Sequence, residues 1–156
     1  MEFPDLPSDE TPPENVVLFH FEDVQFEIPD EPAIMEWLCS VAEKEETPFY
    51  EVNYIFCSDE YLRKINVEYL DHDYYTDIIT FPYDSDAVHG DMYISSERVA
   101  DNAQNNGVTF HQELLRVMVH GILHMIGYGD KTPEQEKTMR EKENVYLKLL
   151  TGKTGI

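Results

Sequence analysis

Residues 110–126 read FHQELLRVMVHGILHMI, and the expected fold is built around them. Apolar side chains lie almost all round the helix that these residues predict, and a helix with that pattern is buried in the centre of a domain. Thr109 and Gln112 form a capping-box pattern at its start, and Gly127 stands where the helix would stop. We therefore expect a central helix that the other elements surround.

The rest of the chain mixes strands and helices joined by short connections. Runs that alternate in polarity predict strands, and apolar residues three and four apart predict helices. Strands are expected over 16–21, 24–28, 50–57, 77–81 and 88–94, with a tight turn at 22–23. Helices are expected over 33–46, 58–69, 95–106 and 133–150. These elements predict an α+β fold: a mixed β-sheet of about four to five strands, packed with a buried central helix and surrounding helices.

Length and composition indicate one domain. The chain has 156 residues, 42% of them apolar, which is enough to form a core. Residues 1–14 hold four prolines and many acids, which predicts a mobile acidic tail before a single domain over 15–156. No apolar run approaches the roughly 20 residues of a membrane span, and no signal peptide is visible. We therefore expect a cytoplasmic protein with no membrane association.

The formal net charge is −21, from 11 basic and 32 acidic residues. This charge argues against a protein that holds nucleic acid by general electrostatic attraction. From residue 131 onward, however, six bases exceed four acids, so the overall sign does not describe every face.

Cys39 and Cys57 lie too far apart in sequence for a CxxC site, and we expect both to be free thiols.

A candidate metal site lies at the end of the central helix. His120 and His124 are four residues apart, so both imidazoles project from one face, about 40° apart around the helix axis. A chain reversal at Gly127 can return Asp130 to the same ion as a third ligand, which leaves a position for water. The alternative is a pair of hydrogen-bonded core histidines. We expect one zinc ion per chain, and nickel or copper could bind the same ligands in vitro.

The spacing nearly matches the metzincin pattern H-E-x-x-H-x-x-G-x-x-H. Asp130 stands in place of the third histidine, and Gly121 in place of the glutamate that acts as general base. The missing glutamate counts against peptide hydrolysis by the usual route. Gly121 is expected instead to let another backbone pack closely against the helix.

Three motifs together resemble the YbeY family of endoribonucleases and rRNA maturation factors. Residues 120–128, HGILHMIGY, resemble the family signature H-G-x-L-H-L-x-G-Y. Residues 76–82, TDIITFP, are similar to its T-D-V-L-S-F-P strand, and residues 90–95, GDMYIS, to its G-D-I-x-I-S strand. The resemblance implies a zinc-binding α+β fold and a role in ribosomal RNA processing and small-subunit quality control. It places His120 and His124 at the first two metal histidines.

The sequence departs from that family pattern at two positions. The third metal histidine falls at Asp130, and the arginine that usually follows L-N-x-x-[FY] falls at Leu70. An arginine near the metal can hold a phosphate, so another cation is expected to substitute for it. The candidates are Arg63, Lys64, Arg98 and Arg116.

The catalytic acid or base is left open by the sequence. Asp77 and Asp91 each lie on a predicted strand of the motif region and are candidates for this role, against a plain role in strand-end hydrogen bonding. With Arg116 they form the set of candidate catalytic residues.

The expected function is a metal-dependent endoribonuclease that acts on single-stranded rRNA in rRNA maturation and small-subunit quality control. The expected partners are rRNA and the small ribosomal subunit or an assembly particle, and no DNA is expected. One alternative is a metallopeptidase-like hydrolase. Another is a non-catalytic, metal-stabilised ribosome assembly factor.

Overall fold

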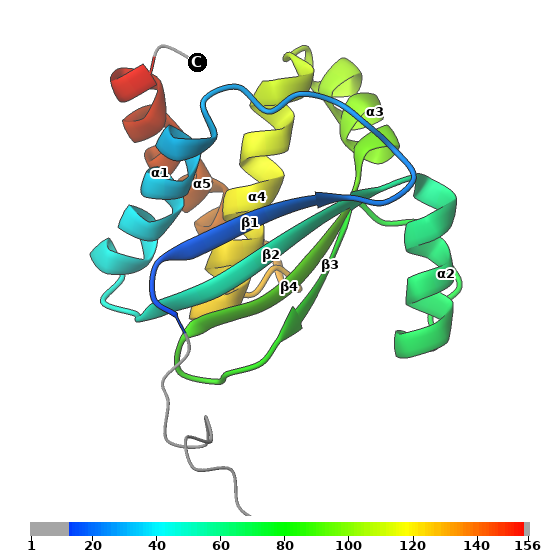
Figure 1. Ribbon diagram of the computed structural model, residues 1–156, viewed down its shortest axis with the longest axis horizontal. Coiled ribbons are helices and arrows are strands. Elements are labelled where there is room, and N and C mark those ends of the chain that lie inside the picture. Colours follow the sequence, from blue (N-terminus) through cyan, green and yellow to red (C-terminus); the bar gives the residue numbers. More distant parts are fainter. Residues whose placement is uncertain (1–12, 155–156) are drawn as a thin grey trace, which may run out of the picture.

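The computed structural model describes residues 13–154, and in this range it has the expected α+β architecture, with a four-stranded mixed sheet and five helices (Figure 1). The tail expected over residues 1–14 falls almost wholly on residues 1–12, which lie outside the described residues. The strands are β1 Val16–Phe21, β2 Phe49–Cys57, β3 Ile78–Pro82 and β4 Val88–Ser95. The helices are α1 Glu31–Lys44, α2 Asp59–Leu70, α3 Ser96–Asn106, α4 Phe110–Ile126 and α5 Pro133–Thr154.

The sheet has the order β1-β2-β4-β3. β1, β2 and β4 run parallel, and β3 pairs antiparallel with β4 at one edge. Residues that alternate along β4 point to opposite faces of the sheet, so Met92 and Ile94 enter the main core while Tyr93 packs on the opposite side near α2. The helix α4 runs behind the sheet in Figure 1, with α1 and α5 beside it.

The central helix is buried as its sequence predicts. Leu114, Met118, Ile122 and Leu123 have almost no exposed surface, and burying such a side chain stabilises the fold by about 1.5–3 kcal/mol. The capping box between Thr109 and Gln112 is present. The helix is therefore fixed by apolar packing along its length and by side-chain hydrogen bonds at its start.

Gly121 allows a close contact with the sheet, although not with a backbone as the sequence suggested. A Cβ atom at this position would lie 2.3 Å from Sδ of Met92 and 3.0 Å from Cδ1 of Ile78. The helix therefore rests directly on side chains of β3 and β4 at this point. A glutamate here would meet the same packed side chains, and overpacking of this kind costs about 1–3 kcal/mol.

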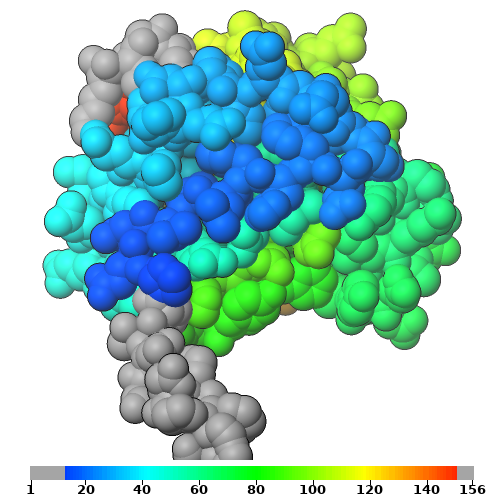
Figure 2. Space-filling model, in the orientation of Figure 1, coloured from blue at the N-terminus to red at the C-terminus, as the bar shows by residue number. Residues whose placement is uncertain are grey.

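The strand expected over residues 24–28 is wrong: the chain bends at residues 22–23, where the tight turn was expected, but no hairpin follows. β1 pairs in parallel with β2, and residues 24–28 form no ladder. Their alternating apolar side chains pack on the core instead: the ring of Phe26 lies 5.0 Å from that of Phe56 and 5.2 Å from that of Phe110. In Figure 2 the first part of the described chain, in blue, forms a continuous band over this face.

Two general expectations concern the cysteines and the membrane. Cys39 and Cys57 are both free, as expected, and burial raises the pKa of the Cys39 thiol to about 11. Within residues 13–154, no helix combines the length and the apolar character needed to cross a bilayer.

Candidate metal centre

The end of α4 and the turn after it bring together His120, His124 and Asp130. Gly127 ends the helix with φ of 128°, a conformation that a side chain would strain. Its N–H group donates to the carbonyl groups of Leu123 and His124, both at 3.1 Å. The chain then reverses, and Asp130 returns to the face that carries both imidazoles.

The separations of the three side chains fit a tetrahedral metal ion. Oδ2 of Asp130 lies 3.4 Å from Nε2 of His120 and 3.3 Å from Nε2 of His124. Two ligands of a tetrahedral zinc ion lie about 3.4 Å apart when each bond is about 2.1 Å long. One ligand atom from each of the three residues lies within 4.8 Å of the others. The residues present therefore fit a metal ion held by two nitrogens and one oxygen.

Glu143 of α5 contacts this group from inside the molecule. Its Oε2 lies 2.7 Å from Nδ1 of His120, and its side chain is only 5% exposed. Burial alone would raise the pKa of Glu143, but hydrogen bonds from His120 and Arg116 outweigh burial and lower it. Burial would likewise lower the pKa of His120, and the contact with Glu143 raises it above the ordinary value.

Glu143 is not among the residues predicted from the sequence, although the pattern of α5 contains a signal for it. Met139, Tyr146 and Leu150 are buried on one side of α5, and Glu143 lies at the same helical spacing. A carboxylate within a buried stripe needs a partner, because burying it alone is costly. That pattern could have identified Glu143 as a residue bound to another polar group.

A second carboxylate fixes the turn that carries Asp130. Oε1 of Glu45, at the end of α1, accepts a hydrogen bond of 2.7 Å from the hydroxyl of Tyr128. Oε2 of Glu45 accepts from Nζ of Lys142 at 2.9 Å and also from the hydroxyl of Tyr146. Tyr128 is therefore held in place by α1 and α5, and its hydroxyl is engaged within the fold.

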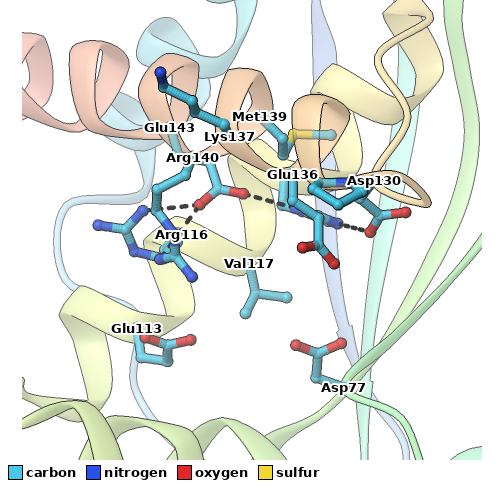
Figure 3. A pocket seen from close by; sticks show the side chains of 12 residues that line it. Asp77, Glu113, Arg116, Val117, Asp130, Glu136, Lys137, Met139, Arg140 and Glu143 are labelled. Atoms are coloured by element: carbon cyan, nitrogen blue, oxygen red, sulfur yellow. Dashed lines mark hydrogen bonds and ion pairs between the residues drawn. The ribbon is translucent and has the colours of Figure 1, made fainter.

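A pocket of about 570 Å³ lies beside His120 and Asp130, between α4 and α5. Figure 3 shows the side chain of Asp77, just before β3, directed into this space. Burial raises the pKa of the Asp77 carboxyl. The structure thus places one of the candidate acid or base residues in the same pocket as two of the candidate metal ligands.

The other candidate, Asp91, lies on the opposite face of the sheet. Its Oδ1 accepts from Nδ2 of Asn53 at 3.2 Å, and its Oδ2 accepts from the hydroxyl of Tyr83. It lines a separate hollow with aromatic side chains of β3 and β4. The structure therefore brings Asp77, and not Asp91, to the pocket beside the metal ligands.

Among the arginines considered in place of Leu70, Arg116 lies in the pocket. Its Nη1 donates to Oε1 of Glu143 and its Nη2 to Oδ1 of Asn144, both at 2.8 Å. Arg63 pairs with Glu60 and Asp73, and Arg98 with Asp59, away from this pocket. Leu70, at the end of α2, does not line it either.

Known proteins resemble this chain over most of its length. The family model described as Endoribonuclease YbeY matches residues 19–151. A relative named Endoribonuclease YbeY from Flavobacterium psychrophilum is 48% identical over 135 residues, which cover 86% of this chain and 96% of the relative. One with the same name from Cytophaga hutchinsonii is 47% identical over 138 residues, which cover 87% of this chain and 96% of the relative.

The fold is also similar to a solved structure. The solution structure of TM1509 from Thermotoga maritima superimposes with a TM-score of 0.63 at 29% sequence identity, over 88% of this chain and 90% of that one. The sequence motifs, the fold and the family match agree with one another. The chain therefore belongs to the YbeY family.

Proposed function

We propose that this protein is a metal-dependent endoribonuclease that cleaves single-stranded ribosomal RNA. The observation that carries the proposal is the convergence of His120, His124 and Asp130 beside an open pocket. The family model and the relatives, all described as endoribonucleases, support the choice of RNA as substrate. In this proposal the protein works in the cytoplasm, in rRNA maturation and small-subunit quality control.

Zinc is the ion that the ligands favour. Two imidazole nitrogens and one carboxylate oxygen are a common ligand set for catalytic zinc, and nickel or copper would bind the same set in vitro. When bound, the ion supplies a Lewis acid that polarises a phosphodiester oxygen and lowers the pKa of a water molecule. The ligand side chains are 21–40% exposed, so substrate and water can reach them from the pocket.

Asp77 is the residue that we assign to proton transfer. Burial raises the pKa of its carboxyl toward neutral pH, and a general acid or base works best when its pKa lies near the working pH. It lines the pocket without belonging to the three candidate ligands. A substrate phosphodiester in the pocket would therefore have Asp77 on one side and the metal ligands on another.

The net charge of the protein affects how it binds RNA. A net charge of −21 disfavours binding to bare RNA of any sequence. We therefore propose that the small ribosomal subunit or an assembly particle presents the rRNA and supplies part of the affinity. The peptidase alternative is disfavoured because Gly121 lacks the carboxylate of that mechanism and faces packed side chains of β3 and β4.

The first prediction concerns metal-dependent cleavage. Protein loaded with one zinc ion per chain should cut single-stranded rRNA fragments, and removal of the ion by a chelator should abolish cutting. His120→Ala should lose both the ion and the activity. His111→Ala is the matched control, because this histidine lies on the same helix but outside the pocket, where its Nε2 contacts the carbonyl of Glu27 and its ring packs against Phe110.

Other outcomes would favour the alternatives. An uncut rRNA fragment with one metal ion still bound per chain would favour the assembly-factor function. Hydrolysis of casein by the metal-loaded protein, lost in His120→Ala, would favour the peptidase function.

The second prediction concerns Glu143. Its carboxylate holds the proton of His120 on Nδ1, which leaves Nε2 free to bind a metal. Glu143→Gln should therefore weaken zinc binding about 10–100-fold, measured by competition with a chromophoric chelator. Glu141→Gln, which removes an exposed carboxylate of the same helix, should leave the affinity unchanged. Equal affinities in the two variants would contradict the role of Glu143.

The third prediction concerns Asp77. Burial raises the pKa of Asp77, so the folded state favours the protonated carboxyl over the ionised one. The stability that the protonated carboxyl contributes is therefore lost as pH rises through the pKa of the folded state. Asp77→Asn removes this loss of stability, and the free energy of unfolding of the metal-free protein at pH 7 should stay equal or increase. The kcat for RNA cleavage should fall about 100-fold or more. A variant with unchanged kcat would exclude Asp77 from proton transfer.

A further inference from the structure

Three basic side chains line the pocket. Arg116 comes from α4, and Lys137 and Arg140 come from successive turns of α5. Figure 3 shows the two arginines close together at the carboxylate of Glu143, with Asp130 and Glu136 on the other side. The pocket is therefore divided in charge, with basic groups on one side and the candidate metal ligand Asp130 on the other.

Three cations lie on the basic side, and two carboxylates lie near them: Glu143, and Glu113, which interacts electrostatically with Arg116 and Arg140. Oε1 of Glu143 lies 2.8 Å from Nη1 of Arg116 and 3.7 Å from Nη1 of Arg140, so one carboxylate forms ion pairs with two guanidinium groups. The side chain of Arg140 is 59% exposed, and among the described residues it forms no other ion pair. Lys137 is exposed and forms no ion pair within the described part of the chain. Donors of both side chains remain available to a ligand.

We propose that Arg140 and Lys137, backed by Arg116, form an anion subsite for a phosphate of the RNA backbone. That phosphate belongs to a nucleotide next to the one cleaved at His120, His124 and Asp130, so the inference rests on the proposed function. Guanidinium groups match phosphate oxygens in geometry and charge. The pocket volume of about 570 Å³ lies within the range of roughly 300–1,000 Å³ usual for ligand sites.

The acidic groups of the same pocket select the kind of anion. Asp77, Glu113 and Glu136 also line it, and they would repel a compact ligand that concentrates several negative charges. A single-stranded backbone carries one charge per nucleotide and can pass along the basic side alone. The family pattern usually has an arginine at the position of Leu70, and Leu70 lies outside the pocket, so the subsite would supply a cation that this chain lacks at that position.

The test measures binding separately from cleavage. The probe is a fluorescent 2′-O-methyl hexanucleotide, incubated with zinc-loaded protein and checked on a gel to be intact, with affinity followed by fluorescence anisotropy at several salt concentrations. Arg140→Gln and Lys137→Gln should each weaken binding about fivefold. Each should also reduce the slope of log affinity against log salt by about 0.7, the value for one lost contact to single-stranded nucleic acid.

Lys148→Gln is the matched control, because Lys148 is an exposed cation of the same helix outside the pocket. It should bind the probe as the unchanged protein does, and circular dichroism should show all variants folded. Equal losses in Lys148→Gln and the pocket variants would overturn the subsite, since diffuse attraction would then explain binding. Undetectable binding by the unchanged protein at low salt would overturn it as well.

Cleavage assays on the same proteins separate the two proposals. If the unchanged protein cuts RNA, Arg140→Gln should raise KM with little change in kcat. If this variant has unchanged KM and unchanged affinity for the probe, the subsite is rejected and the nuclease proposal is retained. If the unchanged protein cuts no RNA but the pocket variants lose affinity for the probe, the nuclease proposal fails, and the basic side is then a phosphate site of a protein that binds RNA without cutting it.

Discussion

The burial of α4 is the constraint on which the rest of the structure depends. This helix is apolar almost all round, so the sheet must cover one side of it and α1, α3 and α5 the others. Gly121 lets it rest directly on Met92 of β4. Such a helix is held at several points along its length, and side chains that project from its end are therefore held in place as well. A metal site needs this property, because its ligands must be close together before the ion arrives.

Glu113, Arg116 and His120 share one side of α4 and line the pocket. Arg116 and His120 both face α5, which provides Glu143 as a common partner. A buried carboxylate without a partner would cost about 1–3 kcal/mol or more, so these three groups stabilise one another as a set. The set also links the candidate metal ligand to the basic side of the pocket, because the same carboxylate contacts His120, Arg116 and Arg140. Metal binding and phosphate binding would thus depend on one buried residue.

Features that depend on local sequence could be predicted, and features that depend on distant contacts could not. Helical spacing and the glycine at 127 were enough to expect His120, His124 and Asp130 in one place. Residues 24–28 have the alternation of a strand, but their rings pack against Phe56 and Phe110 because β1 already pairs in parallel with β2. Glu143 lies 23 residues from His120 in sequence, so only the packing of α5 on α4 brings them together.

The proposed function requires that His120, His124 and Asp130 bind one metal ion at the edge of the pocket. The most direct test is a crystal structure of zinc-loaded protein with diffraction measured at the zinc absorption edge. We expect one anomalous peak per chain, within about 2.2 Å of Nε2 of both histidines and of a carboxylate oxygen of Asp130. A fully occupied zinc ion held by other residues, with these three side chains bonded only to one another, would contradict it.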